Sequence, residues 1–216
     1  MPFKASIVLC EGTSDEAFVK ALIRARGIQH VDVIERRKDP KFKPPGVGGF
    51  QQRLEALKFE PGIEKRKAIV LLADNDLDAN NLFTSIVGLI NAAGEYNAPP
   101  RVWEGSNRGK YPPIHIVNLP TRTDPGCVEM LWLQSAEPKA PAIKLCIDRL
   151  IVCLGLVGWS PGNVAKLKLR CLVAATLQKN PTLKIEDVWY DRDQQRDIIP
   201  LDHQCFNPLA NYLGGL

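Results

Sequence analysis

The sequence predicts an α/β fold in which a compact sheet of about four mainly parallel strands is flanked by helices. Two short, continuous apolar runs, at residues 6–10 and 67–73, are typical of strands buried on both faces. Segments with apolar residues at helical spacing alternate with such runs, which indicates parallel βαβ units. From residue 125 the pattern becomes helical. We therefore expect an α/β core (1–124) with a helical C-terminal section (125–216) packed on it as one compact domain.

The expected elements of the core follow one another with short connections. A turn at 11–15 follows the first strand, and Ser14 is the expected N-cap of the next helix. The expected strands are residues 6–10, 31–34, 67–73 and 114–119. The expected helices are residues 15–26, 50–57, 79–92, 128–133, 143–154 and 164–178. Proline and glycine break the pattern between the last three helices.

Composition excludes several classes of protein. Apolar residues make up 45% of the 216 residues and charged residues 24%, which are ordinary globular values and exclude a disordered chain. The net charge of +4, from 28 basic and 24 acidic side chains, is mild. No run of about 18 apolar residues suggests a membrane span. The first residues lack the layout of a secretory signal, so we expect a cytoplasmic protein with no membrane partner.

The six cysteines form no C-x-x-C pair and no short-spaced cluster with histidine. Disulfide frameworks belong to short secreted chains, and zinc sites need close ligand spacing. We interpret the cysteines as reduced, mostly buried thiols.

Two acidic turns follow predicted buried strands. Glu11 comes directly after the first strand, and Asp74 and Asp76 come directly after the third. Ligands of open parallel sheets bind beyond the carboxyl ends of the strands. Carboxylates that converge there repel one another unless a cation or a shared proton neutralises them, and oxygen ligands favour Mg²⁺ or Mn²⁺. Asp78 is a further metal-ligand candidate, although Asp is also common in turns and as a helix N-cap.

Two segments, 9–15 (LCEGTSD) and 71–76 (LLADND), carry a resemblance to the Toprim domain. This catalytic domain occurs in bacterial primases, type IA and type II topoisomerases, RecR-type repair proteins and OLD-family nucleases. The resemblance implies a compact parallel sheet with Glu11 as a metal ligand or general acid/base. It also implies that Asp74 and Asp76 are metal ligands.

Later segments resemble small, stand-alone, OLD-nuclease-like Toprim proteins of uncharacterised function. These segments are residues 124–131, 166–170 and 200–213. The resemblance implies that Glu129 helps to form a second metal position, and that Lys168 or Arg170 neutralises the phosphate in the transition state. The simpler interpretation of all three residues is the polar face of an amphipathic helix. The sequence has no Walker motif and no tyrosine-nucleophile, zinc-ribbon, helicase or ATPase segment.

A basic segment suggests contacts with a nucleic-acid backbone, which confer affinity without sequence choice. The basic residues of this segment are Arg36, Arg37, Lys38, Lys41 and Lys43. Arg170, far along the chain, is a further candidate for such contacts. Trp103 and Tyr111 lie near basic residues and are candidates for stacking on bases. Each basic cluster taken alone is also compatible with an ordinary solvated surface.

Three hypotheses follow. The first is a Mg²⁺- or Mn²⁺-dependent nuclease, or a related phosphotransfer protein, that acts on DNA or RNA. The second is a non-catalytic Toprim scaffold that binds nucleic acid or protein. The third is a phosphoacceptor pocket of the response-regulator kind, which the extra helices disfavour. The number of metals stays open, as does the oligomeric state, for which a homo-oligomer is one option.

Overall fold

The computed structural model contains one four-stranded sheet in the order β2-β1-β3-β4, with every neighbouring pair parallel. The strands are β1 (Ser6–Cys10), β2 (Val31–Val33), β3 (Ala68–Asp74) and β4 (Ile114–Leu119). This arrangement confirms the predicted α/β fold, its parallel sheet and its flanking helices. The structure describes residues 5–35, 45–156, 158–177, 182–189 and 198–216.

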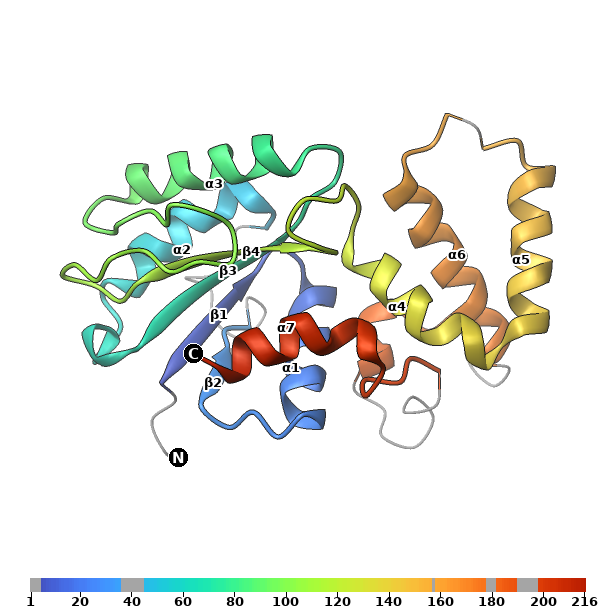
Figure 1. Cartoon of the computed structure of the whole chain (residues 1–216), viewed down its shortest axis with the longest axis horizontal. Helices are drawn as coiled ribbons and strands as arrows, with labels where there is room; N and C mark the ends of the chain where they lie inside the picture. The colour runs from blue at the N-terminus through green and yellow to red at the C-terminus, as the bar shows by residue number, and fades with distance from the viewer. Residues whose placement is uncertain (1–4, 36–44, 157, 178–181, 190–197) are drawn as a thin grey trace.

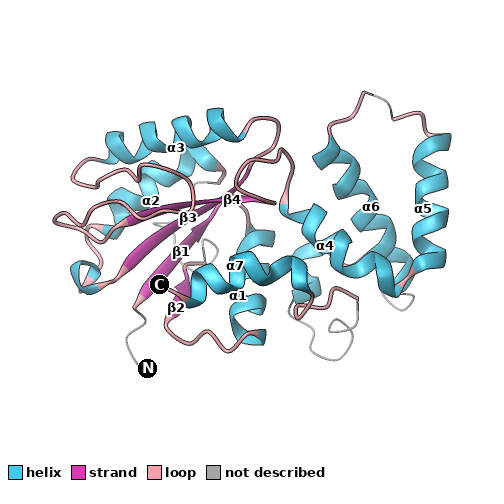
Figure 2. Cartoon of the chain, in the orientation of Figure 1, coloured by secondary structure: helices cyan, strands magenta, loops and turns pink. Residues whose placement is uncertain are grey.

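The helices cover both faces of the sheet and extend beyond one end of it (Figure 1). Helices α2 (Phe50–Leu57) and α3 (Ala79–Ala93) lie on one face, and α1 (Thr13–Ala25) and α7 (Asn207–Gly214) lie on the other. Helices α4 (Val128–Ala136), α5 (Pro141–Cys153) and α6 (Pro161–Thr176) form a helical section beside the carboxyl ends of the strands, as Figure 2 also shows.

The strands are mostly apolar because each face of the sheet is covered. Along β1, Val8 and Cys10 belong to the core beneath α1, α4, α6 and α7, whereas Ile7 and Leu9 belong to the core beneath α2 and α3. Alternate side chains of a strand point to opposite faces, so a doubly covered strand loses the polar positions of an ordinary alternating pattern.

Chain topology explains why the ends of β1 and β3 are special. From β1 the chain passes through α1 to β2 on one side, and the later strands β3 and β4 lie on the other side. Helices α1 and α2 therefore cover opposite faces, and the winding reverses between β1 and β3. Open α/β sheets bind ligands in the crevice beyond such a switch point.

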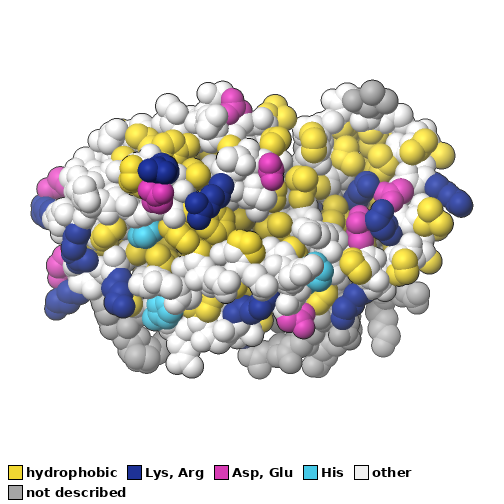
Figure 3. Space-filling view, viewed as in Figure 1, with side chains coloured by type: hydrophobic (Ala, Val, Ile, Leu, Met, Phe, Trp, Pro, Cys, Tyr) yellow, Lys and Arg dark blue, Asp and Glu magenta, His cyan; other side chains and the backbone are white. Residues whose placement is uncertain are grey.

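Aromatic side chains join the helical section to the sheet core. The ring of Trp132 on α4 lies 5.4 Å from that of Phe18 on α1, and the ring of Phe206, just before α7, lies 5.4 Å from the same Phe18 ring. All three side chains are fully buried. On the outer side, Val152 of α5 is 79% exposed, and Figure 3 shows hydrophobic side chains on the surface of this section. Within the described ranges, no helix combines the length and apolar character that a membrane crossing requires.

The observed boundaries differ from the expected ones mainly at helix ends. Helix α1 begins at Thr13, with Gly12 as the N-cap residue, so the expectation that Ser14 caps it was wrong. Helix α6 begins at Pro161, and α7 was not predicted as a separate element. Both begin with proline near the first helical position, where its missing N–H costs no hydrogen bond.

Candidate metal centre

Glu11 and Asp74 meet at the switch point between β1 and β3. The backbone N–H of Glu11 donates to the Leu72 carbonyl at 2.9 Å, continuing the ladder of β1 and β3 by one residue. The backbone N–H of Asp74 donates to Glu11 Oε2 at 3.3 Å. The two acidic turns, more than sixty positions apart in the chain, therefore form one corner of the molecule.

Asp15 is a further carboxylate in this corner, and the sequence interpretation did not include it as a site residue. It lies in the first turn of α1, is 8% exposed, and its Oδ2 accepts the Gly12 N–H at 2.7 Å. A Cβ on Gly12 would lie 2.8 Å from that same oxygen, so any larger residue at position 12 would require the Asp15 carboxylate to move. The sequence could have indicated Asp15, because it is an acidic residue only four positions after Glu11.

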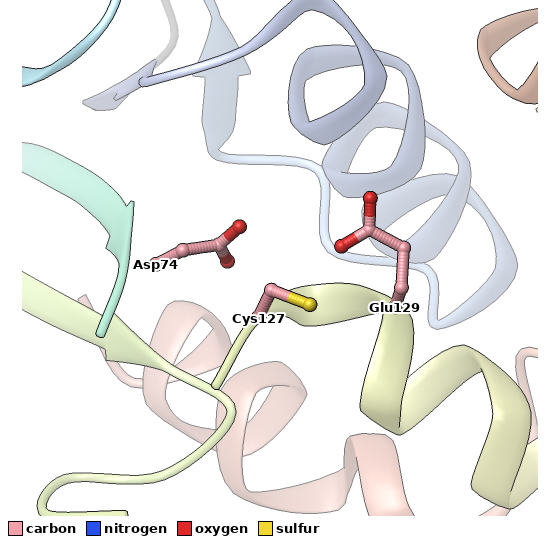
Figure 4. A group of neighbouring side chains, drawn as sticks. All are labelled: Asp74, Cys127 and Glu129. Atoms are coloured by element: carbon pink, nitrogen blue, oxygen red, sulfur yellow. The ribbon is translucent and has the colours of Figure 1, made fainter. Parts of the chain in front are cut away.

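Helix α4 brings two more side chains to the corner. Asp74 Oδ1 accepts the backbone N–H of Val128 at 2.9 Å, at the amino end of α4. One ligand atom each of Asp74, Cys127 and Glu129 lies within 4.8 Å of the others. Figure 4 shows these three side chains around a common space, with Asp74 reaching from the strand end and Glu129 from the first turn of α4.

Asp76 and Asp78 lie further out. Asp76 has a left-handed backbone (φ 46°), which Asp tolerates better than most residues, and its N–H donates to the Gly126 carbonyl at 2.8 Å. Its side chain is exposed, yet near enough for its charge to raise the pKa of Glu11. Asp78 caps α3 by accepting the N–H groups of Asn80 and Asn81 at 2.9 and 3.1 Å. The structure thus gives Asp78 a capping role.

The electrostatics of the corner follow from packing carboxylates away from water. Burial raises the pKa of Asp15 to about 7, with the charges of Glu129 and Glu11 acting in the same direction. Burial, followed by the charges of Asp15 and Glu129, raises the pKa of Asp74 well above its usual range. Burial is also the largest cause of the raised pKa of Glu11. The charges of Glu11 and Glu129 therefore oppose ionisation of Asp15 and Asp74.

Two cations lie near the carboxylates. Burial alone would lower the pKa of Lys166, but nearby acidic groups, led by Glu129, raise it. Lys166 also opposes the raised pKa values of Glu11 and Asp15. Arg53 on α2 is fully buried and donates to the carbonyls of Cys10, Gly49 and Gly46 at 2.5, 3.2 and 3.0 Å. Arg53 thereby fixes the backbone that leads into Glu11.

The remaining predicted site residues lie elsewhere. Lys168 Nζ pairs with Asp148 Oδ1 at 2.5 Å, between α5 and α6, whereas Lys166 is the α6 cation that faces the carboxylates. Arg170 is exposed on α6. The basic positions 36, 37, 38, 41 and 43 lie outside the described residues.

The expected base-stacking role of Trp103 and Tyr111 was wrong. Their exposed fractions are 7% and 9%, respectively. Trp103 Nε1 donates to the Asn118 carbonyl at 3.3 Å, and the ring of Tyr111 lies 4.8 Å from that of Tyr96. Both aromatic side chains are packing residues of the polar segment before β4.

The donor set fits a divalent cation. Glu129 Oε2 is enclosed and has no hydrogen-bond partner among the described residues, which is costly for a carboxylate oxygen unless another group binds it. The charge of Glu11 raises the pKa of both Asp15 and Asp74, and the charge of Asp15 also raises the pKa of Asp74. A cation would satisfy the unpartnered oxygen and offset the repulsion together.

The fold and this corner define an α/β protein with a cluster of carboxylates at the topological switch point of a parallel sheet. Residues 5–200 match the model of a family described as "Protein of unknown function (DUF3226)". The chain belongs to this family. No curated protein and no solved structure matches the chain.

Proposed function

We propose that this protein hydrolyses phosphodiester bonds in nucleic acid with the help of Mg²⁺ or Mn²⁺. The observation that supports this most is the cluster of Glu11, Asp15, Asp74 and Glu129, in which Glu129 Oε2 is enclosed without a partner. The cluster's place beyond the carboxyl ends of β1 and β3 is the usual ligand position of such sheets. The Toprim resemblance of residues 9–15 and 71–76 points to the same chemistry.

In this proposal Asp15, Asp74 and Glu129 would hold the ion, which when bound would activate a water and stabilise the leaving oxygen. Glu11 accepts a proton from the attacking water at its carboxylate. Its raised pKa makes this carboxylate a stronger base than an ordinary glutamate. Lys166 places a positive charge beside the acidic cluster, where it offsets the charge that develops on the phosphate. Lys166 thus takes the role that the sequence gave to Lys168 or Arg170.

A direct assay tests the proposal. Purified protein is incubated with end-labelled single- and double-stranded DNA and RNA in Mg²⁺, in Mn²⁺ and in EDTA. We expect cleavage that requires a divalent ion and stops on chelation. Binding without cleavage under every ion condition would instead favour the non-catalytic scaffold and overturn the proposed hydrolysis.

A hollow beside the cluster supports nucleic acid as the substrate. It has a volume of about 490 Å³, and Lys166 contributes both to it and to the acidic corner. Trp159, which is 49% exposed, offers a face for a base, and Arg170 offers a contact for a phosphate. Its lining residues are Gly158, Trp159, Ser160, Asn163, Lys166, Leu167 and Arg170.

Trp159→Ala is expected to weaken binding of a single-stranded oligonucleotide by about tenfold, because stacking of one base on an aromatic ring contributes roughly 1–3 kcal/mol. Fluorescence anisotropy of a labelled oligonucleotide in EDTA measures this without cleavage. Phe59→Ala is the matched control, since Phe59 is an aromatic residue that is 83% exposed and lies outside the hollow. Equal affinities for the two variants would contradict a role for the hollow.

We place this activity in the cytoplasm. All six cysteines are free thiols, and four of them (Cys10, Cys127, Cys171 and Cys205) are buried or half-buried, whereas Cys146 and Cys153 are exposed. The expectation of mostly buried thiols therefore holds fully for Cys10 and Cys127 alone. Exposed free thiols persist in a reducing compartment.

A further inference from the structure

Cys127 lies in the acidic corner, for which the sequence analysis predicted oxygen ligands only. Its side chain is fully buried, and its sulfur lies within 4.8 Å of a carboxylate oxygen of both Asp74 and Glu129. Figure 4 shows the sulfur directed into the space that these two carboxylates share. Cys127 belongs to the hydrophobic core beneath α1, α4, α6 and α7, but apolar packing alone does not explain a sulfur placed beside two carboxylates.

Helix capping does not explain it either. Cys127 is the N-cap residue of α4, but its side chain makes no capping hydrogen bond with a described residue. Cysteine is not among the residues that cap helices well. The sulfur has a long contact of 3.6 Å to the Gly162 carbonyl, which is weak for a thiol donor, and a side-chain hydrogen bond with the Glu129 carboxylate.

The surrounding backbone holds the sulfur in this place. A Cβ on Gly162 would lie 3.4 Å from Cys127 Sγ, so α6 packs directly against the thiol. On the other side, the Val128 N–H holds Asp74 Oδ1 at 2.9 Å, which fixes the carboxylate next to the same turn. Glu129 Oε2, enclosed without a partner among the described residues, provides an independent sign that a ligand belongs here.

We propose that Cys127 Sγ is a direct ligand of the ion, together with Asp74 and Glu129. This inference rests on the metal site of the proposed function and specifies which ions it takes. The thiol gives its proton to solvent as it binds, and the thiolate is a softer ligand than a carboxylate. The corner therefore binds borderline ions such as Co²⁺ or Zn²⁺ more tightly than Mg²⁺.

Titration with Co²⁺ tests this inference without an activity assay. A thiolate bound to Co²⁺ gives a sulfur-to-metal charge-transfer band in the near ultraviolet, whereas oxygen ligands alone do not. We expect the band to grow to saturation in the wild-type protein and to be absent in Cys127→Ser. Serine is similar in size and caps helices well, so this variant keeps α4 intact. Circular dichroism and urea unfolding verify that it is folded.

Exposed thiols provide the matched control. The double variant Cys146→Ser/Cys153→Ser, on the exposed part of α5, is expected to keep the band. Calorimetry in parallel should show Zn²⁺ displacing Mg²⁺ from the wild type at least tenfold more readily than from Cys127→Ser. A band that survives in Cys127→Ser, or Co²⁺ binding without any band, would overturn the inference. Either of these two results would concern only Cys127. The proposed hydrolysis is tested separately, by the Mg²⁺ cleavage assay.

Discussion

Asp74→Asn is expected to reduce ion-dependent cleavage by about a thousandfold or more. Asp74 lies between Glu11 and Glu129, and its backbone N–H donates to Glu11 Oε2 at 3.3 Å. A bound ion contributes several kcal/mol to stabilising charge in the transition state, and each 1.4 kcal/mol is about tenfold in rate. The asparagine amide keeps an oxygen that can accept the Val128 N–H but removes the negative charge. Single-turnover cleavage of a labelled oligonucleotide measures the effect.

Asp78→Asn is the control for this prediction. Asp78 belongs to the same acidic turn but caps α3, and asparagine is an equally good N-cap. We expect its cleavage rate and its free energy of unfolding to stay close to wild type. Asp74→Asn should be at least as stable as wild type without ions, since burial and the charges of Asp15 and Glu11 oppose ionisation of Asp74. Equal activity of the two variants would exclude Asp74 from the mechanism.

The ion-free protein is expected to lose stability as the pH rises from about 4 to about 7. The folded-state pKa of Asp15 is about 7, against an ordinary value of 3.8. The folded protein therefore binds a proton across this window that the unfolded chain has released. The stabilisation is complete below the unfolded pKa and is lost as the pH rises through the folded pKa. It is on the order of 4 kcal/mol for Asp15, and the raised pKa values of Asp74 and Glu11 act in the same direction.

Urea unfolding in EDTA near pH 5 and near pH 8 measures this loss. Asp15→Asn should remove much of the difference, because the amide does not ionise and its oxygen can still accept the Gly12 N–H. This comparison matters because His115, whose pKa burial lowers, contributes a stability that rises with pH. Mg²⁺ added at pH 8 should restore stability to the wild type. A wild type whose stability rises from pH 5 to pH 8 in EDTA would contradict the prediction.

The α/β fold class could be predicted from the sequence because the strands are buried on both faces and therefore form continuous apolar runs. The apolar run of β3 is long and ends in charged residues, so the predicted range 67–73 differs from the observed Ala68–Asp74 by one residue at each end. Helix ends were harder, because the first turn of α1 depends on the contact between Gly12 and Asp15 rather than on the expected cap at Ser14. Helix α7 is short, and its packing against α1 and its contact with His30 join residues far apart in the chain.

The candidate site could be predicted only where it follows strands. Glu11 follows β1 and Asp74 ends β3, and the parallel register brings these two residues together, whereas Asp76 lies further out. Cys127 and Lys166 reach the corner through the packing of α4 on α6, which no local pattern reveals. Lys168, two residues further along α6, faces Asp148 instead, and only the rotation of the helix in the folded chain decides between the two lysines.

Asn75, the uncharged residue between Asp74 and Asp76, joins the two parts of the corner. Its side chain is 1% exposed, and its Nδ2 donates to the carbonyls of Thr121 and Asp124 at 2.8 and 2.7 Å. These bonds attach the end of β3 to the segment that leads into α4, so the Asn75 amide helps to position Asp74 relative to Glu129, together with the bond from Val128 N–H to Asp74 Oδ1. If the proposed site binds an ion, an inherited change of Asn75 would weaken that binding while every proposed ligand remained in the sequence, and a survey of those ligands alone would miss the defective copy.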